Sequence, residues 1–304
     1  MDLISIVIVN YNTPQDIRGC LDSLFQVKTS DFKFNVIVVD NGSKKSLQLS
    51  SKYLDHGVHL LRSESNLGFT GGNNLGISHA IKAYQSDYVL LLNSDTVVAP
   101  DFLSFLYHQL KTNPKAGLAA PKIYFYQGFE FFNKSYPSTD KHRVIWYAGG
   151  SVDWVNLASF HRGVDEVDRG QFDQLTESDF ATGCGVLIRR ELIERVGILD
   201  KRFFLYSEDV DYSLRIKRAG FSVLFVPESV IWHKVGRSSG GAGSRLQQYY
   251  QTRNRILLTF KHGPLVAKIT AARLMIQWLL SGNMTERQAV LDFIFGRFGK
   301  QTIV

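Results

Sequence analysis

The sequence predicts a doubly wound α/β fold, in which a mostly parallel sheet is flanked by helices. Short apolar runs rich in β-branched residues recur along the first third of the chain, and such runs are typical of buried strands. Segments with helical patterning separate them, and strands that alternate with helices form parallel sheets covered by those helices. Hydrophobic residues make up 44% and charged residues 21% of the 304 residues, a globular composition that excludes a disordered chain.

The first third is expected to hold four strands and two helices. The strands are predicted at residues 4–9, 36–39, 58–61 and 88–92, and the helices at residues 14–26 and 73–84. Pro14 supports the first helix, because proline suits the first helical position. Polar residues follow these strands, and the carboxyl ends of parallel strands meet at one edge of a sheet, where ligands bind. We therefore expect the functional residues along this edge.

The second half begins less regularly. Residues 124–180 are rich in aromatic residues and are predicted to form an excursion on one side of the sheet, where aromatic side chains either pack or line a ligand site. Regular patterning returns with strands predicted at 185–189 and 222–226 and helices at 191–196 and 208–220. From Leu246 onward the pattern is helical.

After Pro264 this helical region becomes amphipathic and basic, with Lys268 and Arg273 among its apolar residues. The apolar residues at helical spacing are Leu265, Ile269, Ala272, Ile276 and Leu279. Such a face packs against the rest of the protein or a second copy, or else it lies on a membrane surface. It is too short and too charged for a membrane span, which needs about 20 apolar residues.

Charge and cysteine content say little about which class of partner the protein binds. Lys and Arg number 35 against 28 Asp and Glu, and the net charge of +7 suits nucleic acid, a membrane surface or an anionic substrate equally well. Cys20 and Cys184 are the only cysteines, and such sparse use indicates reduced thiols and a cytoplasmic location. We expect no secretory leader, because Met1 and Asp2 lead directly into a strand-like segment.

Asn93, Ser94 and Asp95 end the fourth predicted strand. A carboxylate beside a second oxygen ligand at a strand end is a natural site for a divalent cation, which would neutralise the diphosphate of a nucleotide. The alternative is an Asx turn that only ends the strand.

Glu208, Asp209 and Asp211 open a predicted helix. The helix dipole favours acids there, so helix initiation is one interpretation. Like charges this close also raise one another's pKa, which suits a general base near neutral pH. Glu208 and Asp211 are three residues apart and are expected to share a helix face that Asp209 does not share, so we expect different roles for them.

His233 follows the strand that begins near Ser222 and is predicted to lie on a loop, as a metal ligand or an ordinary surface residue. The Gly- and Ser-rich residues 236–243 follow, and with Lys234 and Arg237 they are predicted to form a cationic lid over a diphosphate. Gly-x4-Gly-Lys-Ser/Thr occurs nowhere, and no Gly-x-Gly-x-x-Gly follows the first strand. The second absence argues against a nicotinamide dehydrogenase.

Two further segments offer nucleotide-binding chemistry. Asp40 stands at a strand end, where its carboxylate can hold a base N–H or a ribose hydroxyl. Residues 66–73 lead into a helix whose N-terminus can face phosphate or ribose oxygens. The alternatives are an Asn-Gly hairpin turn for the first segment and a helix cap for the second.

In their order along the chain, these motifs resemble glycosyltransferase family 2, and most of all its rhamnosyltransferase-like branch. The similar segments span about residues 3–260 and are Ser5-Ile-Val-Ile-Val-Asn-Tyr-Asn12, Val38-Val-Asp-Asn-Gly-Ser43, Asn66-Leu-Gly-Phe69, Leu91-Leu-Asn-Ser-Asp95, Thr182-Gly183, Tyr206-Ser-Glu-Asp-Val-Asp211, Trp232-His233 and Tyr250-Gln-Thr-Arg-Asn254. The resemblance implies a GT-A, Rossmann-like catalytic domain over residues 1–245. Its nucleotide-binding half would span about residues 1–122 and its acceptor-side half about residues 123–245, with a helical appendage over residues 246–304.

The resemblance also implies roles by position. Asp209 matches the general base, and Asp95 and His233 match ligands of Mg²⁺ or Mn²⁺. Asn93 stands where the family's Asp-x-Asp motif often has its first Asp, and its lack of charge is expected to weaken metal binding. The residues expected to bind the nucleotide sugar are Asn10, Asn12, Asp40, Asn66, Gly72, Asn73, Asn93 and Ser94, and those expected near the acceptor or diphosphate are Glu208, Asp211 and Arg253. The alternatives are helix support for Glu208 and Asp211 and a structural salt bridge for Arg253.

The implied activity is inverting transfer of a sugar, with rhamnose favoured, from a dTDP- or UDP-sugar to a glycan or lipid-linked glycan. This activity belongs to cell-surface polysaccharide or lipopolysaccharide synthesis at the inner face of the cell membrane, and no nucleic-acid partner is expected. A sugar nucleotidyltransferase is one alternative, but it needs a Gly-rich basic loop where this chain has Asn10-Tyr-Asn-Thr13. A non-catalytic nucleotide-sugar or glycan-binding protein is the other, and it has no need of Asp95, Asp209 and His233 together.

Overall fold

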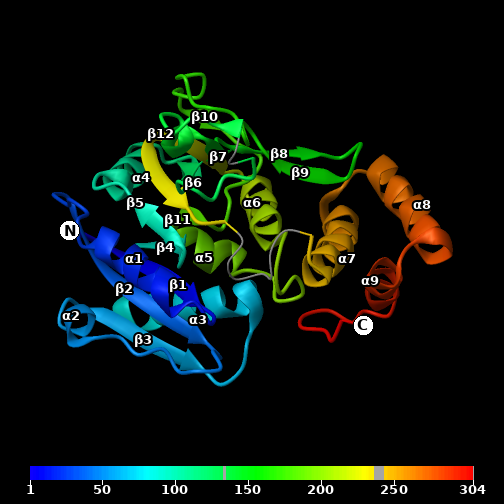
Figure 1. Ribbon diagram of the computed structural model, residues 1–304, viewed down its shortest axis with the longest axis horizontal. Coiled ribbons are helices and arrows are strands. Elements are labelled where there is room, and N and C mark those ends of the chain that lie inside the picture. The colour runs from blue at the N-terminus through cyan, green and yellow to red at the C-terminus, as the bar shows by residue number, and fades with distance from the viewer. Residues whose placement is uncertain (133–134, 236–242, 304) are drawn as a thin grey trace.

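The computed structural model describes residues 1–132, 135–235 and 243–303 (Figure 1). It confirms the predicted fold class, because a mixed and mostly parallel sheet is flanked by helices. Helices α7, α8 and α9 follow in the C-terminal part of the chain and pack against one another, at the end of the molecule away from β3.

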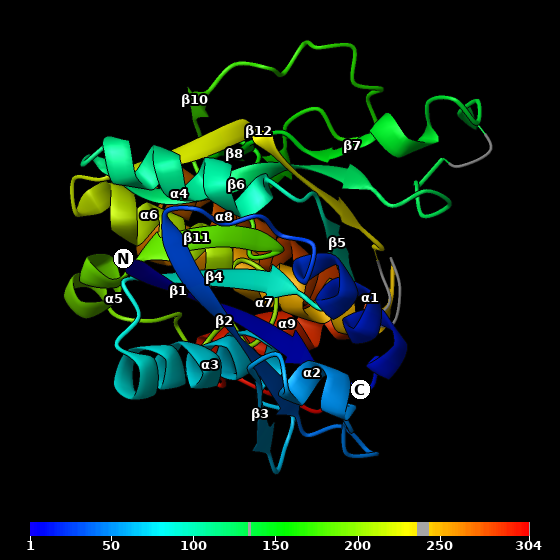
Figure 2. The ribbon, with the colours of Figure 1, turned by 90° about the vertical axis from the view of Figure 1, so that its left-hand side faces the viewer.

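The strands of the main sheet follow one another as Figure 2 shows. Their order is β10 (Thr176–Glu177), β12 (Ser222–His233), β6 (Ala116–Phe125), β11 (Gly185–Arg189), β4 (Tyr88–Asn93), β1 (Asp2–Asn10), β2 (Phe32–Asn41) and β3 (Val58–Ser63). Strands β1 to β4 are parallel, and β6 and β12 form a second parallel pair. Strand β11 joins the two groups by antiparallel pairing with β4 and β6. The carboxyl ends of all six parallel strands therefore reach the same edge.

The remaining elements cover the sheet or extend its edge. The helices are α1 (Pro14–Leu24), α2 (Ser51–Leu54), α3 (Gly68–Tyr84), α4 (Phe102–Thr112), α5 (Arg190–Val196), α6 (Glu208–Arg218), α7 (Arg245–His262), α8 (Leu265–Ser281) and α9 (Met284–Ile294), with a 3₁₀ turn at Lys141–Arg143. The short strands are β5 (Thr96–Val98), which pairs with β12, β7 (Ile145–Tyr147), which pairs with β6, and the hairpin of β8 (Gly150–Asp153) and β9 (Ala158–His161).

Two elements differ in extent from the prediction. Helix α3 begins at Gly68, so residues 68–73 form its first turns rather than a loop before it. Strand β12 runs on to His233 past a register shift between Val226 and Val230. Pro227 within this bulge cannot donate a backbone hydrogen bond, and the prediction ended the strand there. Helix α4 and the first part of β6 lie between residues 102 and 123, where no element was predicted.

Glycines in α3 allow the helix to approach β1 closely. A Cβ at Gly72 would lie 2.8 Å from Val9 Cγ1, and one at Gly76 would lie 2.2 Å from Val7 Cγ1. Both positions therefore accept no side chain without movement of the strand or the helix. The expectation that Gly72 binds the nucleotide sugar is corrected accordingly, because Gly72 faces the sheet.

Gly76→Ala is expected to lower the free energy of unfolding by about 1–3 kcal/mol, because the added methyl group overpacks the contact with Val7. Gly19 of α1 is the matched control, since a Cβ there would meet Lys234 Nζ only at 3.6 Å. Gly19→Ala should be neutral or stabilise by up to about 1 kcal/mol. Urea unfolding measures both changes, and equal midpoints for the two variants would contradict the close packing of α3 on β1.

Candidate active site

The carboxyl edge of the sheet opens into a cavity of about 750 Å³. Its wall includes residues of strands β1, β2, β4 and β12, of the first turn of α6, of one side of α7 and of the β8–β9 hairpin. The sequence-predicted site residues in this wall are Asn66, Asn93, Ser94, Asp95, Glu208, Asp209 and His233. The fold thus brings together Asp209, the expected general base, and Asp95 and His233, the expected metal ligands.

Asp95 and His233 meet at the cavity wall although they are far apart in the sequence. Strand β5 pairs with β12 so that Thr96 lies opposite His233, and Lys234 N–H donates to Asp95 O at 2.9 Å. His233 Nε2 then lies 3.1 Å from Asp95 Oδ1, and both side chains are buried. Burial would lower the pKa of His233, but Cys184 and Asp95 raise it well above the usual value. His233 is the last residue of a strand, which corrects the expectation of a loop.

These two side chains fit a divalent cation. An imidazole nitrogen and a carboxylate oxygen that each lie about 2.1 Å from an ion lie about 3 Å from one another, and the observed 3.1 Å agrees. His233 Nδ1 is buried and has no hydrogen-bond partner in the described part of the chain. The described part of the chain contains no group of three or more His, Cys, Asp or Glu side chains that could hold a metal ion by themselves. Oxygens of a bound diphosphate would have to complete the ligand set.

The backbone before Asp209 adopts an unusual conformation. Phe204, Tyr206 and Ser207 have φ angles of 64°, 71° and 68°, a region that residues with a side chain rarely adopt. Asn254 of α7 holds this stretch, because its Nδ2 lies within hydrogen-bond distance of three carbonyl oxygens of the loop, those of Phe203, Leu205 and Tyr206, at 2.9, 2.8 and 2.8 Å. Asn254 stands in the motif at residues 250–254, which predicted no function for it. The structure shows that it shapes the loop that carries Asp209.

Arg253 completes this clamp and does not face the cavity. Its side chain is fully buried, and its guanidinium group donates to the carbonyl oxygens of Arg202 and Phe203 at 3.0 Å and of Gly299 at 2.9 Å. The Tyr250 ring centroid lies 4.9 Å from the guanidinium carbon. The expectation that Arg253 meets a substrate phosphate is therefore corrected, because the main chain already occupies its donors.

Asp209 faces the cavity from the first turn of α6. Its Oδ2 accepts a hydrogen bond from Gly183 N–H at 3.0 Å, and its Oδ1 accepts one from Val210 N–H at 2.8 Å. A Cβ at Gly183 would lie 2.8 Å from the Phe69 ring, so glycine allows this backbone to approach. Burial raises the pKa of Asp209, and the two hydrogen bonds lower it by less. The carboxylate is thus oriented and more basic than an ordinary aspartate.

Glu208 lies beside Asp209 in the same wall and is 4% exposed. Its Oε2 has no hydrogen-bond partner among the residues that the structure describes. Burial, and then the charge of Asp209, raise the pKa of Glu208 well above its usual value. The repulsion predicted from the sequence is present, but burial is the larger cause.

Asp211 lies outside the cavity wall that Glu208 lines, which corrects the expectation that it binds the acceptor or the diphosphate. It is fully buried, and its Oδ1 lies 2.6 Å from Lys261 Nζ and 2.7 Å from His262 Nε2. Its Oδ2 accepts a hydrogen bond from Arg215 Nε at 3.0 Å. Burial would raise the pKa of Asp211, but these partners lower it. Asp211 therefore joins α6 to α7, and no oxygen of it reaches the cavity to bind an acceptor.

Asn41 and Asn66 hold the segment that enters α3. Asn41 accepts a hydrogen bond from Leu67 N–H at 3.0 Å and donates to Gly68 O at 2.9 Å, and Asn66 Oδ1 accepts one from Gly68 N–H at 2.8 Å. Both asparagines line the cavity. Asn41 was not predicted as a site residue, although it stands next to Asp40 in the motif at residues 38–43.

Asp40 is 1% exposed and lies outside the cavity wall. It is paired with Arg62 and accepts a hydrogen bond from Leu47 N–H at 3.0 Å. Burial would raise the pKa of Asp40, but hydrogen bonds from Ser43 and Leu47 and the charge of Arg62 lower it. A contact between Asp40 and a base or ribose stays a prediction.

Asn10, Asn12 and Asn73 also lie outside the cavity wall. Each side chain is hydrogen-bonded within the protein, Asn10 to Ser43, Asn12 to Lys44 and Asn73 to Phe69. Their neighbours Val9 and Tyr11 line the cavity instead. The donor-binding roles of the three asparagines are untested predictions.

Aromatic residues from the irregular segment form part of the wall. Phe129, Phe131, Trp146 and Trp154 line the cavity, whereas Tyr147 is fully buried. The Trp146 ring centroid lies 4.5 Å from that of His233, edge to face. Both alternatives that the sequence left open therefore occur in this segment, because some of its aromatic side chains pack in the core and others line the cavity.

The predicted lid lies almost entirely outside the described residues, because these omit residues 236–242. Lys234, just before it, lies with Nζ 4.9 Å from the Tyr126 ring centroid and 3.8 Å from Asp16 Oδ1.

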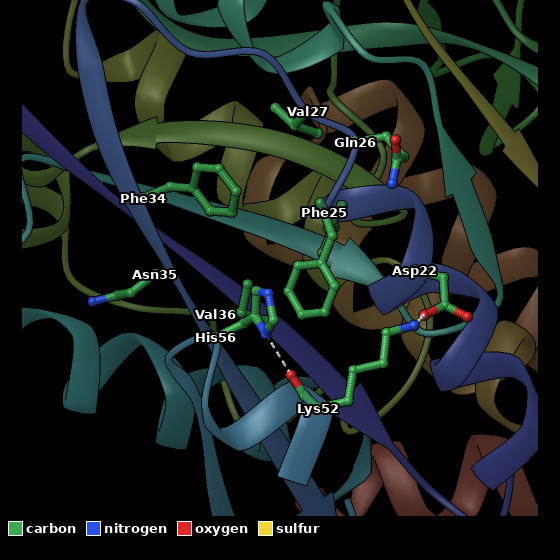
Figure 3. Close-up of a pocket in the computed structure, with 10 residues that line it drawn as sticks. Asp22, Phe25, Gln26, Val27, Phe34, Asn35, Val36, Lys52 and His56 are labelled. Carbon is green, nitrogen blue, oxygen red and sulfur yellow. Dashed lines mark hydrogen bonds and ion pairs between the residues drawn. The ribbon is translucent and has the colours of Figure 1, made fainter. Parts of the chain in front are cut away.

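A second hollow of about 510 Å³ lies beside α1 and α2 (Figure 3). Phe25, Phe34 and His56 line it together with an ion pair between Lys52 Nζ and Asp22 Oδ1, at 2.7 Å. Its described wall contains none of the predicted catalytic or metal-binding residues. We therefore assign the chemistry to the first cavity.

Comparisons with known proteins show the family to which this chain is similar. Residues 5–197 match the model of the family described as Glycosyl transferase family 2. An N-acetylglucosaminyl-diphospho-decaprenol L-rhamnosyltransferase of Mycobacterium tuberculosis is 24% identical over 302 residues, which cover 95% of this chain and 93% of that protein. The dTDP-rhamnosyl transferase RfbF of Shigella flexneri is 24% identical over 243 residues, which cover 77% of this chain and 74% of that protein.

A similar fold is found among solved structures. The mannosyltransferase PcManGT from Pyrobaculum calidifontis, in complex with GDP-Man and Mn²⁺, superposes with a TM-score of 0.55 at 15% identity, over 97% of this chain and 79% of that one. The GT-A fold that the resemblance implied is thereby confirmed. The family match ends at residue 197, before Asp209 and His233, so the positions of these two residues come from the structure.

Arg253→Lys separates a structural role from a phosphate contact. Lysine keeps the charge but cannot donate to three carbonyl groups with a planar fork, so we expect unfolding to cost about 1.5–3 kcal/mol less. The dissociation constant of the nucleotide-sugar donor should hardly change. Urea unfolding and donor titration measure the two quantities. Unchanged stability with much weaker donor binding would contradict the clamp.

Proposed function

Because the chain belongs to glycosyl transferase family 2, we propose that it transfers a sugar from a nucleoside-diphosphate sugar to a hydroxyl group, with inversion at the anomeric carbon. One observation carries this proposal: Asp209 and the Asp95–His233 pair lie in the wall of a single cavity. The Asp209 carboxylate can accept a proton, and the Asp95–His233 pair suits a divalent cation beside the leaving diphosphate.

Asp209 is the proposed base. Its carboxylate takes the proton of the acceptor hydroxyl while that oxygen bonds to the anomeric carbon, and the bond from this carbon to the diphosphate breaks on the opposite side. The electron pair of the broken bond leaves with the diphosphate. A single displacement inverts the carbon and needs no carboxylate nucleophile. The N–H groups of Gly183 and Val210 orient the Asp209 carboxylate for this step.

Asp95 and His233 are the proposed ligands of Mg²⁺ or Mn²⁺, which would neutralise the charge that develops on the diphosphate. The 3.1 Å separation of their ligand atoms and the Mn²⁺ in the PcManGT complex support this assignment. Asn93 and Ser94 lie beside the pair in the cavity wall and can donate hydrogen bonds to ribose or diphosphate oxygens.

The proposed donor is dTDP-rhamnose, and the proposed acceptor is a lipid-linked glycan in cell-surface polysaccharide synthesis. The names of the two relatives, which specify a rhamnosyl group, dTDP and a diphospho-decaprenol, support this choice. Both cysteines are unpaired and buried, which suits a reducing compartment and thus the inner face of the cell membrane. The aromatic side chains in the cavity wall suit a sugar ring.

Asp209→Asn is expected to lower the rate of sugar transfer by about 100-fold or more, because the amide cannot accept the proton. Donor binding should be retained. Glu208→Gln is the matched control, since a neutral amide resembles the protonated carboxyl that its raised pKa favours. It should keep most of the activity. Transfer assays and donor titration on the same preparations measure these effects.

A full transfer rate in Asp209→Asn would overturn the base assignment, and donor binding without transfer or donor hydrolysis in the unaltered protein would favour a binding protein. The pH profile gives an independent check. Protonated Asp209 cannot act as a base, so activity should fall as the pH drops through its pKa. Because that pKa is raised, the fall should come at a higher pH than for an ordinary aspartate.

The donor can be identified by thermal unfolding with a panel of nucleotide sugars and Mn²⁺. A ligand of the native state at 100 times its Kd adds about 2.7 kcal/mol of stability. We expect dTDP-rhamnose to raise Tm more than UDP-glucose or GDP-mannose does, and EDTA to remove most of the shift. A larger, metal-independent shift with another donor would overturn both the sugar and the metal assignment.

A further inference from the structure

Helices α8 and α9 expose apolar side chains that the described chain does not cover. On α8 they are Leu265, Val266, Ile269, Ile276 and Leu280, with 73%, 75%, 47%, 58% and 76% of their surface exposed. On α9 and the next residue they are Met284, Leu291, Ile294 and Phe295, with exposures of 67%, 42%, 51% and 64%. We call these nine residues the apolar C-terminal face.

The exposed residues of α8 form one stripe. At 3.6 residues per turn, the five residues from Leu265 to Leu280 fall within an arc of about 100°. Ala267 and Ala271, the buried residues of this helix, lie on the opposite side and pack against Leu157. The interpretation in which Leu265, Ile269 and Ile276 pack onto the rest of the chain is thereby corrected.

The residues around this face carry a net positive charge. Residues 265–304, which include α8 and α9, contain five Lys and Arg against two Asp and Glu, a formal charge of +3 in 40 residues, whereas residues 1–264 contain 30 against 26. Arg273 lies within the stripe of α8, and Arg287, on α9, donates a hydrogen bond to Leu280 O at 3.1 Å. Arg297 and Lys300 are exposed just beyond α9. Positive charge is therefore denser around the apolar C-terminal face than in the rest of the chain.

We propose that the apolar C-terminal face lies in the surface of a membrane that contains anionic lipids. An amphipathic helix with basic residues binds such a surface in its plane, since apolar side chains enter the acyl boundary and cations meet the headgroups. A second copy would bring two positively charged faces together, and like charges disfavour that contact. Every helix in the described part of the chain is too short or too polar to cross a bilayer.

The face lies next to the active-site cavity. Leu157, which packs against α8, and Trp154 belong to the β8–β9 hairpin and line the cavity. Figure 1 shows the tip of this hairpin reaching the start of α8, and Val155 at the tip is 81% exposed. Membrane contact would hold the cavity near the headgroups, where a diphosphate-linked sugar projects from its lipid. This consequence rests on the proposed function, whereas the lipid contact itself does not.

The test is co-sedimentation of the full chain with vesicles of phosphatidylcholine, with or without phosphatidylglycerol. We expect binding to the anionic vesicles, and at least roughly tenfold weaker binding to neutral vesicles or at high salt. The double variant Ile269→Glu and Leu280→Glu should weaken binding to anionic vesicles by a similar factor. The matched control is Leu54→Glu and Leu60→Glu, on α2 and β3, where both leucines are also exposed. It should bind as the unaltered protein does.

Thermal unfolding and donor binding in solution show that each variant is folded. No binding to anionic vesicles, or equal loss in the control, would overturn the proposal. So would a dimer in solution that Ile269→Glu and Leu280→Glu dissociate, in the absence of vesicle binding. Vesicle binding by a protein that transfers no sugar would support the membrane surface and overturn the proposed function alone.

Discussion

The active site depends on a loop whose backbone is held in an unfavourable conformation by α7. Three residues of this loop have left-handed φ angles, and each such residue costs of the order of 1–3 kcal/mol. Asn254 and Arg253 offset this cost by donating to the loop's carbonyl oxygens. Because the loop leads directly into Glu208 and Asp209, the position of both acids depends on the clamp. Gln251 and Arg255 of α7 also line the cavity, so this helix contributes to the wall of the site as well as to the clamp.

Strand pairing places the two proposed metal ligands, Asp95 and His233, beside one another. The antiparallel contact between β5 and β12 sets His233 opposite Thr96 and therefore beside Asp95. The bulge after Val226 changes the register of β12 against β6 before this point is reached. Val226 pairs with Pro121 and Val230 with Lys122, a shift of three residues. In a strand of period two, a register change by an odd number of residues turns every later side chain to the other face. The meeting of Asp95 and His233 thus follows from the bulge as much as from the residues themselves.

The acidic cluster shows how environment separates neighbouring groups of the same type. Burial raises the pKa of Glu208 and Asp209, neither of which is paired with a basic side chain among the described residues. Three basic side chains lower the pKa of Asp211. Only Asp209 combines a raised pKa with two main-chain hydrogen bonds that orient it towards the cavity. Sequence spacing predicted different roles for these acids but grouped Glu208 with Asp211, because it could not include the contacts that α7 makes with Asp211.

The sequence by itself determined the α/β class, the approximate positions of the strands and the family, because these depend on local periodicity and on the order of short motifs. It also identified Asp95, Asp209 and His233 as candidates. Only the tertiary structure decided that Arg253 and Asp211 are held by contacts within the protein, that Gly72 packs on β1, and that Asn41 and aromatic residues of the irregular segment line the cavity. It also decided that the apolar stripe of α8 faces outward. A side chain's surroundings are set by elements distant in the chain, and periodicity within one segment carries no information about them.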